Sequence, residues 1–189
     1  GTFFEMGCFS MYPAKVMTAG EGGFIVTNNK KLRDKLLMIR NHGMLKGYDT
    51  RLLGLNLRLP EINAAIATVQ MKKLPKFLKT REKNAKLLSK LLSKSNLDLP
   101  VERKNENVNW YLYTVTTPKR NMLLKKLNAK GIGAASYYPI PVHKTPFYKS
   151  KTKLPITDWA ASNALSLPIH PKVTKKNIEF IAKTVSEVL

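Results

Sequence analysis

The chain has 189 residues, which is long enough to bury a hydrophobic core and to form one or two domains. It contains 33 Lys and Arg against 12 Asp and Glu, a formal net charge of +21. Such an excess raises the question of a nucleic acid or another anionic surface as partner. No RNA- or DNA-binding motif accompanies the charge, so we expect the lysines on solvated helix faces and do not expect nucleic acid as the partner.

The single cysteine, Cys8, excludes an intrachain disulfide framework. Its neighbours are apolar, so we expect a small core residue at this position and not a nucleophile. No run of about 18 apolar residues exists, so no membrane-spanning segment is predicted. No signal peptide is visible in these residues, and a cytoplasmic location is the default expectation.

Residues 8–27 are the most informative stretch of the chain. They open with a short apolar run and close with a β-branched segment at residues 24–27, which predicts a strand. We therefore expect an irregular loop between two buried strands, with Lys15 in that loop among apolar neighbours. Partial desolvation of a lysine favours the neutral amine, and a neutral amine can attack a carbonyl to form a Schiff base.

The next segments carry helical signals. Residues 30–40 have apolar side chains at helical spacing, and residues 41–43 are typical of a helix C-terminal cap. Residues 44–59 have no clear period and predict a loop. A helix begins at Pro60, a kink or break is expected near Pro75, and a second helical stretch runs to about residue 93.

The remaining residues predict a smaller α+β unit. A polar, aperiodic link covers residues 95–107, and residues 110–117 are the clearest strand. A helix at 121–130, a strand at 134–137, a brief extended piece at 166–168 and a helix capped by Thr174 follow. We place the domain boundary at the link, which gives domains at residues 1–94 and 95–189.

Five motifs in order resemble one family. Phe9-Ser-x-Tyr-Pro-x-Lys15, followed by Gly-Glu-Gly-Gly at 20–23, resembles the lysine segment of the DegT/DnrJ/StrS-type sugar aminotransferases, which depend on pyridoxal 5'-phosphate (PLP). The resemblance continues through Arg-Asn-His-Gly at 40–43, Gly-Leu-Asn-Leu-Arg at 54–58, Pro-Glu-Ile-Asn-Ala-Ala at 60–65 and Tyr-Tyr-Pro-Ile-Pro-Val-His at 137–143. It covers nearly the whole chain.

The resemblance implies a fold and a place within it. The family's subunits are roughly twice as long as this chain, with the lysine near the middle, so the chain resembles the C-terminal half of a member. The implied fold class is α/β: the C-terminal part of a PLP-dependent transferase of fold type I. It would comprise the end of the large α/β domain with the PLP lysine, long helices, and a small α+β domain. In the family, the other half supplies the acidic partner of the pyridine nitrogen and the residue that stacks on the ring.

The resemblance also implies site residues. Lys15 would be the catalytic and cofactor-holding lysine, and Ser10 would bind the cofactor phosphate. Asn56 would reach the phosphate of the partner subunit's cofactor in a homodimer with shared active sites. Substrate contacts would come from Arg58, Tyr138 and His143. No metal is expected, because the histidines lack metal-ligand spacing.

The residues alone leave simpler alternatives open. The hydroxyl of Ser10 could bond its own backbone in a turn. Residues 54–58 could be a half-buried strand with its polar face in water, and His143 could be an ordinary hydrogen-bonding loop residue.

The implied function is a PLP-dependent aminotransferase that moves an amino group, usually from glutamate, to a keto-sugar nucleotide. We expect the 189 residues to be inactive on their own. Some family members are sugar dehydratases in which the lysine is replaced, and the presence of Lys15 argues against that branch. The alternatives are a non-catalytic regulatory or scaffold derivative of the fold, and a basic nucleic-acid-binding domain.

Overall fold

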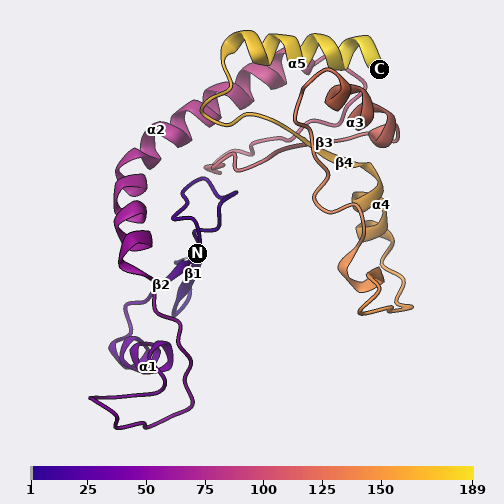
Figure 1. Ribbon diagram of the computed structural model, residues 1–189. Coiled ribbons are helices and arrows are strands. Elements are labelled where there is room, and N and C mark those ends of the chain that lie inside the picture. The colour runs from indigo at the N-terminus through magenta and orange to yellow at the C-terminus, as the bar shows by residue number, and fades with distance from the viewer. Residues whose placement is uncertain (1) are drawn as a thin grey trace. The chain divides into compact units, whose positions relative to one another are not determined.

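The computed structural model describes residues 2–189, which divide into two compact units. The first unit ends at Pro75 and the second begins at Lys76. This contact boundary lies inside helix α2 (Glu61–Leu92), which is one continuous helix in Figure 1. The domain division at residues 94 and 95 stays a prediction, because a contact boundary within a helix does not decide where a domain ends.

The first unit is built on a two-stranded antiparallel sheet. Strands β1 (Gly7–Ser10) and β2 (Gly23–Val26) pair with Gly7 opposite Val26 and Ser10 opposite Gly23. Helix α1 (Lys30–Arg40) follows, and the first turns of α2 complete the unit. A small apolar cluster joins the loop between the strands to α2; it comprises the buried Met11, Met17 and Ala19 and the partly buried Phe24, Leu59, Ala67 and Leu74.

The strands of this sheet are exposed, so the expectation of two buried strands is wrong. Of the four residues of β1, only Gly7 is buried, and Ile25 of β2 is 46% exposed. Cys8 is exposed as well, which corrects its assignment to the core. The reason is that apolar composition predicts a strand, whereas burial requires another layer against the sheet, and residues 2–189 supply little of one.

The predicted helix at residues 30–40 is confirmed as α1, and so is its cap. The Asn29 side chain accepts a hydrogen bond from the Leu32 amide (3.2 Å), and Gly43 donates its amide to the Met38 carbonyl (2.8 Å). Gly43 has φ +74°, and a Cβ at Gly54 would lie 2.1 Å from the Gly43 nitrogen. The chain after the cap can therefore pass this closely over the helix end only with glycine at both places.

A kink or break is expected near Pro75; helix α2 continues through Pro75, so it is not broken there. Pro75 removes one backbone donor from the helix. Burial holds the helix on both sides of it, because Leu74 packs in the first unit's cluster and Leu88 and Leu92 lie in the second unit's core. Tertiary packing thus outweighs the helix-breaking tendency of proline here.

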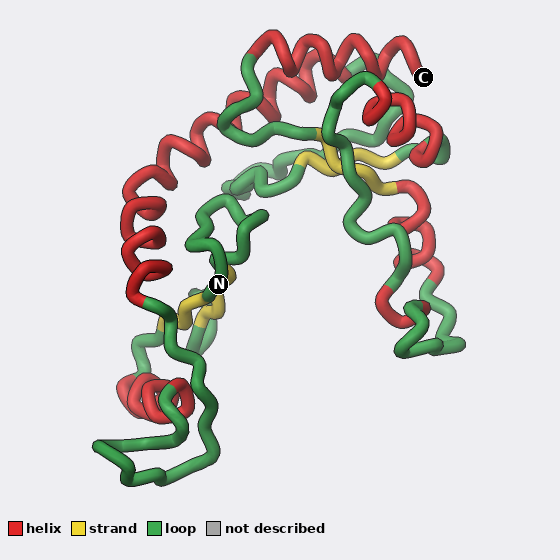
Figure 2. The backbone as a smooth tube through the Cα atoms, viewed as in Figure 1, coloured by secondary structure: helices red, strands yellow, loops and turns green. Residues whose placement is uncertain are grey.

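The second unit has a larger antiparallel sheet (Figure 2). Strands β3 (Tyr113–Thr116) and β4 (Ala164–Leu167) pair directly, with Tyr113 opposite Leu167. Single bridges extend the sheet on both sides, from Asp98 to Thr116 and from Ala135 to Ser166. The helices of this unit are the C-terminal part of α2, α3 (Arg120–Ala129), α4 (Pro155–Asn163), α5 (Lys175–Val188) and the 3₁₀ turn Val142–Lys144.

One hydrophobic core holds this unit together. Its buried side chains come from α2, both strands, α3 and α5, and Tyr113, Leu127 and Leu165 are fully buried in it. The predicted helices at 121–130 and after Thr174 are confirmed, and Thr174 and Asn177 form a reciprocal capping box.

Two predicted strands are shorter than expected. Trp110 has φ +49° and the Asn109 side chain accepts from the Tyr111 amide (3.0 Å), so the chain is turned at these residues and β3 begins only at Tyr113. The strand expected at residues 134–137 is reduced to one bridged residue, Ala135. No helix among residues 2–189 is long and apolar enough to cross a membrane.

Candidate functional site

Lys15 lies half-buried in the loop that joins β1 to β2. The loop is closed at its base by backbone hydrogen bonds from Met11 to the Gly22 carbonyl (2.9 Å) and from Ala19 to the Met11 carbonyl (3.0 Å). Within it, the Lys15 amide donates to the Tyr12 carbonyl (3.0 Å), which forms a turn. The predicted loop between two strands is therefore present, and its own backbone fixes the position from which Lys15 projects.

Asn63 of α2 also holds this loop. Its side-chain amide donates to the carbonyls of Ala19 (2.6 Å) and Glu21 (3.3 Å). The sequence analysis did not identify Asn63 as a site residue. A usable signal was present: an amide side chain in the first turns of a helix, among small apolar residues, needs partners when it is half-buried.

Gly22 allows the loop to pass close to the segment before α2. Its φ is +131°, and a Cβ there would lie 2.6 Å from Cδ1 of Leu59. A side chain at this position would clash with Leu59 and strain the backbone. Glycine at position 22 therefore lets the chain turn tightly after the lysine.

Ser10 ends β1, immediately before the lysine loop. Its Oγ accepts a hydrogen bond from the Tyr12 amide (3.3 Å), which is the turn role that the sequence left open. The hydroxyl still carries its own proton, so it can donate to an anionic oxygen at the same time. Ser10 is exposed, and its role toward a phosphate stays a prediction.

The segment at residues 54–58 runs antiparallel to the end of α1. Asn56 forms a bridge with Asn41, and the amide of Leu57 donates to the Arg40 carbonyl (2.9 Å). The Arg58 guanidinium donates through Nη1 to Oδ1 of Asn41 (2.6 Å). The residues on either side of Asn41 therefore hold the backbone at Asn56, and the Asn41 side chain holds Arg58, a role that was not predicted from the sequence.

Tyr138 and His143 lie in the second unit, whereas Ser10, Lys15, Asn56 and Arg58 lie in the first. Tyr138 is 73% exposed. His143 is half-buried in the 3₁₀ turn, and its Nε2 is buried without a hydrogen-bond partner among residues 2–189. An orphaned buried nitrogen indicates that a further polar group belongs beside it.

Two surface hollows lie away from these residues. One, of about 670 Å³, is lined by residues beside the start of β1 and the end of β2, among them Glu5 and Asn29. The other, of about 520 Å³, lies between α3 and α5 and includes Met122 and Val188. Neither is lined by any residue of the candidate site. No group of three or more His, Cys, Asp or Glu side chains in residues 2–189 is arranged to hold a metal ion.

Comparison with known proteins gives the family. The model of the DegT/DnrJ/EryC1/StrS aminotransferase family matches residues 1–186. The chain belongs to this family. The resemblance that the motifs indicated is therefore confirmed.

Named relatives agree with this membership. A protein of Geobacillus stearothermophilus named "Pleiotropic regulatory protein" is 34% identical over 187 residues, which cover 95% of this chain and 50% of that protein. The UDP-N-acetyl-3-dehydro-alpha-D-glucosamine 3-aminotransferase of Acidithiobacillus ferrooxidans is 32% identical over 100% of this chain and 52% of its own length. The chain thus spans about half the length of the curated relatives it matches.

Solved structures show the same fold. S. venezuelae DesV in complex with a ketimine intermediate superposes with a TM-score of 0.92 at 32% identity, over 96% of this chain and 51% of that one. A family aminotransferase from Brucella abortus gives a TM-score of 0.91 at 29% identity, over 98% of this chain and 51% of that one. The fold class expected from the sequence, part of an α/β transferase of fold type I, is therefore confirmed.

Proposed function

We propose that this chain provides the lysine-bearing part of a PLP-dependent aminotransferase that transfers an amino group, with glutamate as donor, to a keto-sugar nucleotide. The observation that carries the proposal is Lys15, half-buried in a fixed loop within a chain of the aminotransferase family. Relatives named as transaminases of UDP- and dTDP-linked sugars support the substrate class. We place the reaction in the cytoplasm, in keeping with the single cysteine.

The residues present fit PLP by their chemistry. The cofactor carries an aldehyde, which needs an amine, and a phosphate, which needs hydrogen-bond donors. The first unit offers the amine of Lys15 and the hydroxyl of Ser10, two residues before the turn that positions the lysine backbone. Asn56 adds an exposed amide side chain on a fixed backbone segment.

Bound PLP supplies an electron sink for the carbanion that forms when a carbon beside the amino nitrogen loses its proton. Lys15 would hold the cofactor through Nζ, and once the incoming amine has displaced it, the freed Nζ would accept that proton and return it to a second carbon. Ser10 would donate its hydroxyl proton to a phosphate oxygen. Arg58, held by Asn41, would orient an anionic group of the substrate with its remaining guanidinium donors.

Tyr138 and His143 are our candidates for contacts to the sugar nucleotide. The exposed ring of Tyr138 can pack against a sugar or base, and the unpartnered Nε2 of His143 can bond a polar group. Both stand beside prolines in a stiff segment, which limits the entropy lost when a ligand binds.

The test of the proposal is borohydride reduction of the family-length enzyme with PLP, followed by peptide mapping. We expect the pyridoxyl mass on Lys15. Label on another lysine would refute the assignment, and the absence of any label would favour the alternative of a regulatory derivative of the fold, a class suggested by the name of the Geobacillus relative. The 189 residues alone are expected to show no transamination above background.

We further propose a homodimer with shared sites, in which Asn56 binds the phosphate of the partner subunit's cofactor. Small residues on the exposed side of α2, such as Ala65, suit a close contact between copies, and a two-fold axis would make the contact reciprocal. Loss of one hydrogen bond to a charged oxygen in Asn56→Ala should cost about 1.5–3 kcal/mol of PLP binding.

Subunit mixing tests this sharing directly. Full-length Lys15→Ala subunits and Asn56→Ala subunits are each expected to be impaired. In a heterodimer, one of the two sites has both residues intact if the site is shared, so activity should rise on mixing. If heterodimers form and activity does not exceed the sum of the parents, Asn56 does not act across the dimer.

A further inference from the structure

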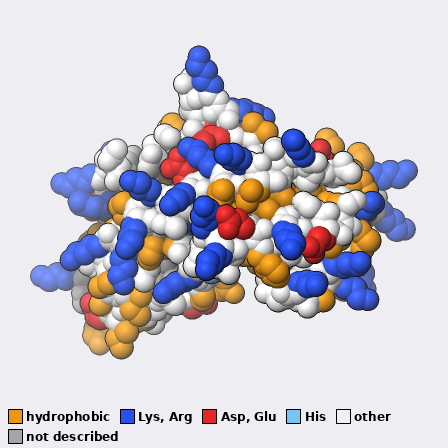
Figure 3. Space-filling model, turned by 90° about the horizontal axis from the view of Figure 1, so that it is seen from above, with side chains coloured by type: hydrophobic (Ala, Val, Ile, Leu, Met, Phe, Trp, Pro, Cys, Tyr) orange, Lys and Arg blue, Asp and Glu red, His pale blue; other side chains and the backbone are white. Residues whose placement is uncertain are grey.

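The basic charge of the chain is not evenly distributed. The second unit, residues 76–189, contains 22 Lys and Arg against 7 Asp and Glu, and so carries most of the excess. Figure 3 shows one face of the molecule on which Lys and Arg side chains far outnumber Asp and Glu.

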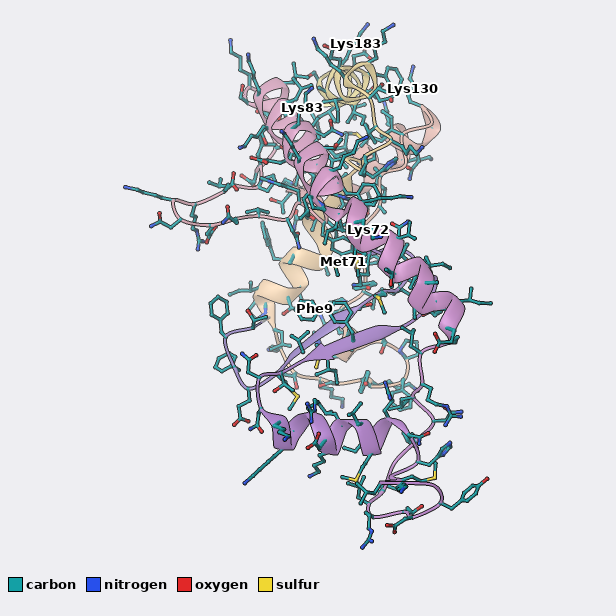
Figure 4. All side chains as sticks on the ribbon, turned by 90° about the vertical axis from the view of Figure 1, so that its left-hand side faces the viewer. Phe9, Met71, Lys72, Lys83, Lys130 and Lys183 are labelled. Carbon is teal, nitrogen blue, oxygen red and sulfur yellow. The ribbon has the colours of Figure 1, made fainter. Side chains whose placement is uncertain are left out.

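Five lysines of α2 form a row, which we call the lysine stripe: Lys76, Lys79, Lys83, Lys86 and Lys90. They recur every three or four residues, and at 3.6 residues per turn they fall within an arc of roughly 80° around the helix. With a rise of 1.5 Å per residue, the row is roughly 21 Å long. Lys72 continues it by one turn toward the helix start, and Figure 4 labels Lys72 and Lys83 along α2.

The stripe faces away from the core. The buried residues of α2, among them Arg81, Ala85 and Leu88, lie on the opposite side of the helix, and all five stripe lysines are exposed. Over the length of the stripe, the side of α2 that bears Ala85, Leu88 and Leu92 is buried in the second unit, and the opposite side presents the stripe lysines.

The arrangement differs from that of α5 in the same unit. On α5, Lys175 pairs with Glu179 and Lys183 pairs with Glu187, each at i,i+4. On the stripe, Lys86 pairs with Glu82, and no other stripe lysine forms an ion pair within residues 2–189. Like charges at i,i+3 and i,i+4 destabilise a helix, so α2 carries a repulsion that α5 avoids by alternating charge.

We propose that the lysine stripe binds the phosphate backbone of a single-stranded nucleic acid. A straight row of cations matches one chain of phosphates, and phosphate contacts need no apolar anchor and no base-reading element. An anionic membrane surface fits less well, because a helix that lies on a bilayer presents its apolar face together with its cations, whereas Ala85, Leu88 and Leu92, within the span of the stripe, are buried. The proposal does not depend on the aminotransferase function.

The proposal is tested by measuring the affinity of the chain for a labelled single strand of about 20 nucleotides. The measurement is repeated at salt concentrations from about 50 to 200 mM. In the stripe variant, all five lysines are replaced by Gln. Each phosphate contact contributes about 0.7 to the slope of log K against log salt for a single strand, so we expect the magnitude of the slope to fall by about 3.5. A second variant with Arg at the five positions should bind like the native chain.

The matched control removes five other exposed lysines of the same unit: Lys104, Lys149, Lys151, Lys153 and Lys172. This control and the stripe variant have equal net charge, so a stripe-specific site predicts that the control keeps most of the slope. Equal losses in both variants would show that only net charge matters and would overturn the proposal. So would binding to vesicles of about three parts phosphatidylcholine to one part phosphatidylglycerol without binding to the oligonucleotide.

Discussion

The two units of this chain differ most in how much core they contain. In the first, three buried side chains support the lysine loop, and the sheet leaves Phe9, Ile25 and Val26 between 38% and 46% exposed. In the second, one continuous core draws on three helices and both strands. The unit with the candidate chemistry is thus the one with the smaller core.

Because of this difference, the two units hold their structures in different ways. A two-stranded sheet is marginal as an independent structure, so the first unit depends on its loop hydrogen bonds and on Asn63 to fix the lysine. The chain spans about half of its relatives' length, and their structures place this part within a larger fold. We infer that the first unit gains its full order from further layers, whereas the second is stable by itself.

The largest effect is expected for substitutions of Lys15, which should lower transamination activity but not the stability of the fold. Lys15→Ala and Lys15→Arg in the family-length enzyme should lower transamination by at least ~10³-fold, because neither side chain can hold PLP or move the proton. Thermal unfolding measured without PLP should be unchanged, since Lys15 belongs to neither hydrophobic core. Lys30→Ala, an exposed change at the start of α1, is the control and should keep activity.

Matched truncations in the two cores should give unequal losses of stability. Leu127→Ala removes a fully buried side chain from the large core and should cost about 2–5 kcal/mol of unfolding free energy. Met11→Ala, at 2% exposure in the small cluster, should cost less, because the surroundings can relax around the cavity. Urea unfolding followed by circular dichroism measures both. Equal costs would contradict the inferred difference between the units.

The sequence predicted local structure well where the determining contacts are local. The ends of α1 and α5 follow from Asn29, Gly43 and Thr174, whose caps involve neighbours in the chain. The family motifs located the lysine loop for the same reason, since Gly22 and the turn before Lys15 are short-range features.

The errors concern features that depend on distant residues. Cys8 and Phe9 have the composition of a core strand, but burial is decided by what packs against the sheet. Pro75 predicts a kink or break, and packing on both sides of it keeps α2 one unbroken helix. Asn41 and Asn63 have ordinary sequence contexts, and their roles come from carbonyls and a guanidinium brought close by the fold.

Asn63 allows a test of how the first unit fixes its loop. Asn63→Ala removes the donors to the Ala19 and Glu21 carbonyls and should cost about 1–3 kcal/mol of local stability. Amide hydrogen exchange should then speed up in residues 11–22 and stay unchanged in β3 and β4. Thr68→Ala is the matched control, because its hydroxyl bonds only the Ala64 carbonyl of its own helix. Equal amide exchange rates in Asn63→Ala and Thr68→Ala would show that the loop's own backbone hydrogen bonds are enough to fix it.

The smallest effect is expected at His170 in the second unit, as a pH dependence. Burial, and next the nearby Arg81 guanidinium, lower the pKa of His170 below its ordinary value of about 6.5. Its Nδ1 also accepts from the Lys172 amide (3.3 Å), which the protonated ring cannot do.

Between the lowered pKa and about 6.5, the unfolded chain therefore binds more protons than the folded one. The stabilisation is complete above about pH 6.5 and is lost as the pH falls through the folded-state pKa. Because His170 is largely exposed, we expect under about 0.5 kcal/mol. Urea midpoints of the native chain should fall more between pH 7.5 and pH 5 than those of His170→Gln, which keeps an acceptor but cannot titrate. Parallel curves would show that neither burial nor the charge of Arg81 lowers the pKa of His170 enough to affect stability.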